Sequence, residues 1–64
     1  MKNITFTIET TEELVLVRYE VFNGKDFNIC NDMDDALKMI KELNEIDVNS
    51  YEDFRDEVLN KGWL

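Results

Sequence analysis

The spacing of apolar residues changes once along this chain, near Asn31, from every second residue to every third or fourth. Alternation of apolar and polar residues is typical of half-buried strands, and the longer spacing is typical of amphipathic helices. With 64 residues and no proline, the chain has room for one domain, residues 1–64. We therefore predict an α+β fold, in which a three-stranded antiparallel meander is followed by two helices packed on one face, in the order βββαα.

Two alternating stretches, residues 3–9 and 14–22, predict the first two strands. We expect an even-numbered turn between them, because such a turn keeps their apolar faces on the same side of the sheet. In the expected register, Ile8 lies opposite Val15 and Phe6 lies opposite Val17. The apolar faces assigned to the core consist of Ile4, Phe6 and Ile8 in the first strand, and Val15, Val17, Tyr19 and Val21 in the second.

The dipeptide Asn23-Gly24 predicts a hairpin to a short third strand. A two-residue loop at this dipeptide would bring polar residues opposite Val21 and Tyr19 and mix polar with apolar side chains on one face. A loop one residue longer, which starts at Phe22, places Phe27 opposite Tyr19 and Ile29 opposite Val17. Phe27 and Ile29 then lie on the core side, and that face stays largely apolar. We expect the longer loop, with its glycine in the left-handed conformation that suits this residue.

Two helices are predicted after Asn31. Asn31 or Asp32 caps the first helix, and Ser50 caps the second, with Asp53 three residues later. Gly62 follows the second helix in the position of a C-terminal cap, and Trp63 is expected to fold back onto Val58. The predicted buried stripes are Met33, Ala36, Leu37, Ile40 and Leu43 in the first helix, and Tyr51, Phe54 and Val58 in the second.

Catalytic and cofactor chemistry is not indicated by this sequence. There is no histidine to serve as a base for the single cysteine, Cys30, and adjacent carboxylates in the helices are expected to lie on solvated faces. The acidic stretch that starts at Asp32 does not fit a calcium loop, because Leu37 and Leu43 occupy the positions of the required glycine and glutamate. We expect no enzyme activity, no catalytic residues, no metal and no cofactor.

A cytoplasmic location, in a bacterium or an infected cell, is expected from two features. A lone cysteine cannot form an internal disulfide, which suits a reducing compartment. The first residues carry only Lys2 as a base and alternate apolar with polar residues, unlike a signal peptide.

Charge is the outstanding property of the composition, because 15 acidic residues against seven basic ones give a net charge of −8. Such a surface repels nucleic acid and anionic lipid and favours basic partners. Acidic residues at helical spacing in the second helix and just before it can stand in for DNA phosphates on a DNA-binding protein. The candidate partner-binding residues are Glu42, Glu45, Asp47, Glu52, Asp53, Asp56 and Glu57. Solubility alone is the alternative explanation of this charge.

The stretch from Leu14 to Val58 combines an apolar strand, the Asn23-Gly24 turn, a short strand, an amphipathic helix and the acidic-aromatic segment Tyr51-Glu52-Asp53-Phe54. In these elements the chain resembles the small acidic phage anti-CRISPR proteins that inhibit type II Cas9. The resemblance implies an inhibitor that occupies the site where Cas9 arginines read a short DNA tag beside the target. That family also has a helix before the sheet, which this sequence does not show, and the resemblance assigns no contact residue.

A second hypothesis comes from the other face of the predicted sheet, where Leu14, Leu16 and Phe22 lie opposite the core. If both helices cover one face, the other face meets solvent or a partner. A homodimer through Leu14, Leu16 and Phe22, or through a free edge strand, would make the chain a small structural or regulatory module. The sequence leaves this hypothesis open beside the DNA-mimic inhibitor.

Overall fold

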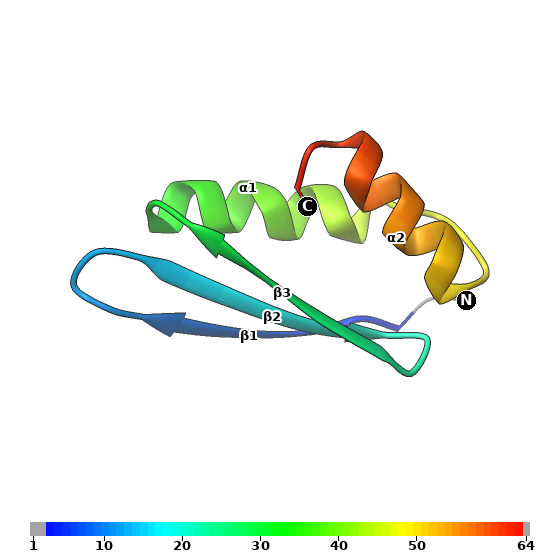
Figure 1. Ribbon diagram of the computed structural model, residues 1–64, viewed down its shortest axis with the longest axis horizontal. Coiled ribbons are helices and arrows are strands. Elements are labelled where there is room, and N and C mark those ends of the chain that lie inside the picture. The colour runs from blue at the N-terminus through cyan, green and yellow to red at the C-terminus, as the bar shows by residue number, and fades with distance from the viewer. Residues whose placement is uncertain (1–2, 64) are drawn as a thin grey trace.

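The computed structural model describes residues 3–63, which form an antiparallel sheet in the order β1-β2-β3 with two helices on one of its faces (Figure 1). The predicted α+β fold with the order βββαα is therefore confirmed. The elements are β1 Thr5–Thr10, β2 Val15–Val21, β3 Gly24–Cys30, α1 Met33–Asn44 and α2 Tyr51–Asn60.

The core lies between the central strand β2 and the two helices. Every second residue of β2 is buried, as the alternating pattern predicts, because the middle strand of a sheet has neighbours on both sides and helices above one face. Phe54 and Val58 of α2 are each 1% exposed, which confirms their predicted burial. The buried core residues are Val15, Val17, Tyr19, Val21, Cys30, Ala36, Met39, Leu43, Ile46, Phe54 and Val58.

Helix α1 buries a narrower stripe than its sequence predicts. Met39 is fully buried, although the prediction leaves it out, whereas Leu37 is 53% exposed and Met33 is 39% exposed. Ala36, Met39 and Leu43 are three and four residues apart and form one row, and α1 packs mainly against β2 and β3. Met33 and Leu37 form the neighbouring row on the helix, and this row is largely exposed.

The turn between β2 and β3 differs from the prediction. Val21 pairs with Gly24, so the loop has two residues, Phe22 and Asn23, with φ of 52° and 63°. Two left-handed central residues form the type I′ turn that suits the twist of a hairpin. The predicted three-residue loop with a left-handed Gly24 is therefore wrong. Phe22 is half-buried against the core, and this packing offsets the strain of its positive φ, which is about 1–3 kcal/mol.

The observed register places Asp26 opposite Tyr19 and Asn28 opposite Val17, on the face that carries the helices. Both polar side chains have partners supplied by later parts of the chain. Arg55 of α2 donates to the Asp26 carboxylate at 2.8 Å, and the Asn28 side-chain amide donates to the backbone carbonyl of Trp63. Because these partners satisfy the polar groups, the face does not need to be apolar throughout.

The turn between β1 and β2 has four residues, so the prediction of an even number is confirmed. The expected pairs are displaced by two residues, because Ile8 lies opposite Val17 and Phe6 lies opposite Tyr19. Thr11 accounts for the longer turn. Its N–H donates to the Leu14 carbonyl at 2.9 Å, and its hydroxyl oxygen accepts from the Leu14 N–H at 3.0 Å.

The helix ends follow the predicted caps. The Asp32 carboxylate accepts from the Asp35 N–H at 2.9 Å, and the Ser50 hydroxyl accepts from the Asp53 N–H at 3.2 Å. After α2, Gly62 has φ of 85°, and the Trp63 N–H donates to the Val58 carbonyl at 3.1 Å. This is a Schellman motif, and it turns the chain back toward the core as expected.

Candidate functional site

The acidic residues of α2 lie on its solvated side. Phe54 and Val58 face the core, and the 100° rotation per residue therefore directs the acids between them outward. Glu52 and Asp56 form one row at a spacing of four residues, and Asp53 and Glu57 form a second row. All four are exposed, so α2 presents two parallel rows of carboxylates to solvent.

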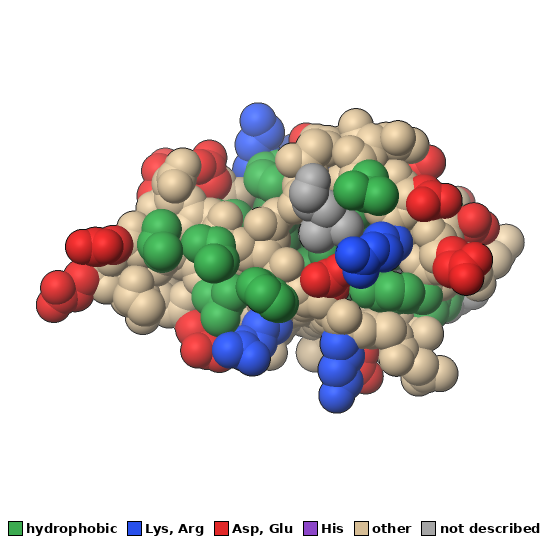
Figure 2. All heavy atoms as spheres, viewed as in Figure 1, with side chains coloured by type: hydrophobic (Ala, Val, Ile, Leu, Met, Phe, Trp, Pro, Cys, Tyr) green, Lys and Arg blue, Asp and Glu red, His purple; other side chains and the backbone are tan. Residues whose placement is uncertain are grey.

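The chain before α2 adds two more exposed acids, Glu45 and Asp47. Figure 2 shows acidic side chains gathered at the end of the molecule where α2 begins. We call these six residues the α2 acidic surface: Glu45, Asp47, Glu52, Asp53, Asp56 and Glu57.

Glu42, the seventh candidate, has a different environment. It is half-buried, and its Oε2 accepts a hydrogen bond from the Trp63 indole N–H at 2.5 Å. This contact fixes the end of the chain against α1. Glu42 therefore stabilises the fold, and we leave it out of the α2 acidic surface.

The carboxylates of the α2 acidic surface are not neutralised within the described part of the chain. Residues 45–57 contain six acids and one base, Arg55, which gives a net charge of −5. Arg55 is already paired with Asp26 at 2.8 Å, and none of the ion pairs among residues 3–63 includes a carboxylate of this surface. A cation from outside these residues therefore meets uncompensated negative charge.

This concentration of charge has a cost for folding. Like charges four residues apart on a helix destabilise it by about 0.2–0.5 kcal/mol per pair, and α2 contains two such pairs, Glu52–Asp56 and Asp53–Glu57. Its last turn has no basic residue to interact with the helix dipole. Acids in the first turn, such as Glu52 and Asp53, stabilise the helix through its dipole. The later acids, Asp56 and Glu57, do not stabilise it in this way, so the stability of the fold does not explain their presence.

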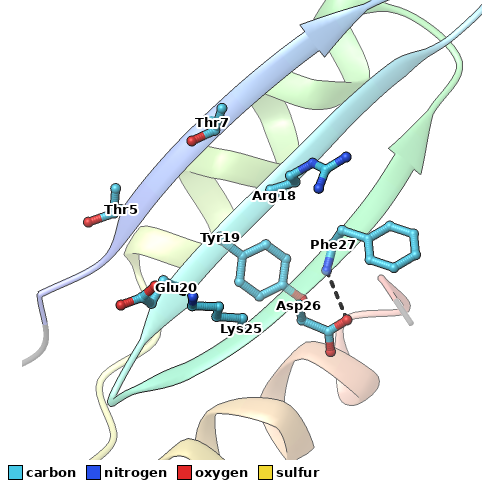
Figure 3. Close-up of a pocket in the computed structure, with 8 residues that line it drawn as sticks. All are labelled: Thr5, Thr7, Arg18, Tyr19, Glu20, Lys25, Asp26 and Phe27. Atoms are coloured by element: carbon cyan, nitrogen blue, oxygen red, sulfur yellow. Dashed lines mark hydrogen bonds and ion pairs between the residues drawn. The ribbon is translucent and has the colours of Figure 1, made fainter.

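A shallow hollow of ≈ 410 Å³ is lined by residues of all three strands, and six of the eight are on the sheet face turned away from the helices (Figure 3). Its two cations are paired with neighbouring carboxylates, Arg18 with Glu9 at 3.1 Å and Lys25 with Glu20 at 3.7 Å. The hollow is therefore close to neutral, in contrast with the rest of the molecule. Its lining residues are Thr5, Thr7, Arg18, Tyr19, Glu20, Lys25, Asp26 and Phe27.

The apolar residues on this outer face differ from the predicted set. Leu14 is 41% exposed and Leu16 is half-buried on it, but Phe22 lies in the turn and packs against the core. Phe27 and Ile29, which were expected in the core, take its place at 56% and 54% exposure. In the observed register of β3, these two side chains point away from the helices. Alternation within the strand fits this register as well as one shifted by a single residue, which would turn them toward the core.

Cys30 ends β3 and is buried, with its Sγ 4.0 Å from the Sδ of Met39. Burial, together with the nearby charges of Asp35 and Asp32, raises the pKa of the thiol. A thiol in this state is a poor nucleophile at neutral pH. Cys30 is therefore a packing residue at the end of the sheet.

Residues 3–63 contain no group of three or more Cys, Asp or Glu side chains arranged to hold a metal ion. None of the described helices has the length and apolar character needed to cross a membrane. Comparison with known protein families, with curated proteins and with solved structures gives no match.

Proposed function

We propose that this protein binds a basic, nucleic-acid-binding protein through the α2 acidic surface and thereby competes with the nucleic acid. The observation that carries the proposal is the set of six exposed carboxylates, on and just before one helix, with a local net charge of −5. The one basic residue among residues 45–57, Arg55, is occupied by Asp26.

Competition follows from the chemistry of the partner. A DNA-binding surface holds phosphates with lysine and arginine side chains, and carboxylates at short spacing on a rigid helix offer the same sign of charge to those side chains. The cation that binds a carboxylate of α2 is then not free for DNA. The resemblance to anti-CRISPR proteins supports the same kind of partner, and a Cas9–guide RNA complex is the first protein to test.

The test is displacement of fluorescently labelled DNA, measured by anisotropy, from a panel of purified basic proteins that includes this complex. Wild type is expected to displace DNA from at least one of them. A variant with Glu52→Gln, Asp53→Asn, Asp56→Asn and Glu57→Gln is expected to be at least about tenfold weaker, which corresponds to about 1.4 kcal/mol. Asp53→Asn is also tested alone, because Asp53 lies in the first turn of α2, where a carboxylate stabilises the helix.

A matched control separates this surface from net charge. Glu12, Glu13, Glu20 and Asp34 are exposed acids on other elements, and changing all four to their amides alters the net charge by the same amount. This control variant is expected to compete nearly as well as wild type. An equal loss in both variants would mean that total charge, and not the α2 acidic surface, is responsible.

A second candidate function is a small structural or regulatory module that binds through the outer sheet face. The exposure of Phe27 and of Ile29, which lies opposite Leu16, favours it. Phe27→Ser with Ile29→Ser is expected to leave DNA competition intact if α2 is the binding surface. Loss of binding in this variant, with binding retained in the amide variant, would favour the second candidate.

A further inference from the structure

The two edges of the sheet expose different backbone groups. A two-residue hairpin closes on a hydrogen-bonded pair, here Val21 and Gly24, and hydrogen-bonded pairs then alternate along the ladder. The backbone N–H and C=O groups that point away from β2 are therefore those of Lys25, Phe27 and Ile29 in β3, and of Phe6, Ile8 and Thr10 in β1. The hydrogen bond from the Thr11 N–H to the Leu14 carbonyl at 2.9 Å fits this alternation.

The edge at β3 is occupied by groups of the chain itself. The Phe27 N–H donates to the Asp26 carboxylate at 2.8 Å, and the Ile29 N–H donates to the Asn28 side-chain oxygen at 2.9 Å. The Tyr51 hydroxyl of α2 donates to the Lys25 carbonyl at 3.3 Å. A strand arriving at this edge would have to displace all three contacts.

The edge at β1 has no such protection within the described residues. No side chain of residues 3–63 is bonded to the outward backbone groups of Phe6, Ile8 or Thr10. The pairing of Thr5–Thr10 with β2 runs without a bulge, and the strand contains neither proline nor lysine. Natural proteins use these devices to prevent pairing at an open edge.

Side chains at the β1 edge also favour a partner. Ile8 belongs to the helix-facing side of the sheet but is 37% exposed, because α1 packs mainly on β2 and β3. The only charged residue of β1 is Glu9, and it is paired with Arg18 at 3.1 Å. On a chain with a net charge of −8, this edge is a nearly uncharged surface with apolar side chains.

We propose that a second copy of this chain pairs with it along β1, antiparallel, to give a continuous six-stranded sheet with all four helices on one face. With Thr7 on the two-fold axis, Phe6 of each copy lies opposite Ile8 of the other. Aromatic residues opposite β-branched residues, and threonine opposite threonine, are favourable cross-strand pairs. Glu9 then lies opposite Thr5, so the two copies do not bring their glutamates face to face.

This proposal does not rest on the proposed function. Tyr51 and Arg55 attach α2 to β3, at the other edge of the sheet, so the α2 acidic surface stays accessible in the dimer. The two interactions also respond to salt in opposite directions. Two copies with net charge −8 repel each other, and salt screens this repulsion and strengthens the dimer, whereas salt weakens binding to a basic partner.

The first test is sedimentation equilibrium of the full chain over a range of concentration and salt. Wild type is expected to approach twice the 7.6 kDa chain mass as concentration rises, and to do so at lower concentration in higher salt. Ile8→Lys is expected to weaken association at least about tenfold, because lysine is a natural protector of open edges. Ile29→Lys, a matched change at the exposed outer face and the opposite edge, is expected to associate as wild type does.

The second test fixes the register by oxidative cross-linking in a Cys30→Ala background. Thr7→Cys is expected to form a disulfide dimer, because residues opposite each other in a non-hydrogen-bonded pair have Cα atoms about 4.5 Å apart, within the range of disulfides. Thr5→Cys, also at an exposed position on the same face, is expected not to cross-link. Its two copies are separated by four residues along the strands, or about 13 Å.

Three results would overturn the proposal. The first is a monomer at every protein and salt concentration, which would mean that any strand pairing with β1 comes from a different protein. The second is a dimer that Ile29→Lys disrupts and Ile8→Lys does not, which would place the contact on the outer sheet face. The third is cross-linking of the Thr5→Cys variant with the same yield as the Thr7→Cys variant.

Discussion

Gly24 is the position at which the hairpin register is tested most directly by mutation. A Cβ atom at Gly24 would lie 2.2 Å from Cδ1 of Tyr51, whereas carbon atoms in contact are about 3.5–4.0 Å apart. The Tyr51 ring also stacks on Phe54, with ring centroids 6.4 Å apart. Gly24→Ala therefore has to move the tyrosine ring by more than about 1 Å.

The magnitude follows from three contributions. Forcing an extra carbon into a packed site costs about 1–3 kcal/mol. Displacing the ring also weakens the hydrogen bond from the Tyr51 hydroxyl to the Lys25 carbonyl, which contributes about 1 kcal/mol. Alanine restricts the unfolded chain and returns about 0.4–1 kcal/mol. We expect Gly24→Ala to lower the free energy of unfolding by about 1–3 kcal/mol.

A double-mutant cycle with Tyr51→Ala separates crowding from backbone strain. When the ring is absent, Gly24→Ala has no side chain to displace, and we expect it to be neutral or stabilising by a few tenths of a kcal/mol. The assay is urea unfolding of the four proteins at one pH. An equal cost of Gly24→Ala in both backgrounds would mean that Gly24 needs a left-handed backbone, and the two-residue turn would then be wrong. A neutral effect in wild type would refute the contact with Tyr51.

Two further predictions concern the core and the chain end. Trp63→Phe removes the hydrogen bond from the indole N–H to Glu42. We expect it to lower the free energy of unfolding, measured in urea, by about 1–3 kcal/mol. An unchanged unfolding midpoint would contradict this contact. Burial raises the pKa of Tyr19 to about 12, and the negative charge of Asp26 adds to this effect. The unfolded chain therefore loses the Tyr19 proton at a lower pH than the folded protein does, so high pH favours unfolding. This group does not lower the free energy of unfolding below about pH 10, and lowers it by up to about 2–3 kcal/mol as the pH approaches 12. Tyr19→Phe is expected to show a smaller fall than wild type, and identical pH profiles would refute the shift.

The number and order of the elements could be predicted from the sequence because they depend on local periodicity. Alternation in residues 3–22 and helical spacing after Asn31 each report the side of an element that faces the core. The caps at Asp32 and Ser50 are local as well, since their hydrogen bonds reach only three residues along the chain. Such features need no knowledge of the tertiary fold.

The register of β3 could not be predicted because distant residues decide it. Asp26 and Asn28 can face the helices only because Arg55 and Trp63, about 30 residues later, supply their partners. Gly24 follows the turn because the Tyr51 ring lies against it. A rule that places only apolar residues on the core face therefore selected the wrong register for this strand.

The exposure of the candidate residues was predicted with mixed outcome for the same reason. Exposure of the acids in α2 follows from helical spacing, and all four are exposed to solvent in the structure. Glu42 is also an acidic residue of a predicted helix, but its carboxylate accepts a hydrogen bond from the indole of Trp63, which follows α2 in the sequence. Contacts of this kind become visible only when the chain end is placed in space.

We propose above that the α2 acidic surface binds the cations with which a partner holds DNA. The most direct test of this proposal is the salt dependence of competition for labelled DNA by wild type, by the amide variant at Glu52, Asp53, Asp56 and Glu57, and by the control variant with the same net charge. We predict that competition by wild type and by the control variant weakens steeply with salt. The amide variant should compete weakly at every salt concentration. Competition by the amide variant that matches wild type in strength and salt dependence would contradict the proposal.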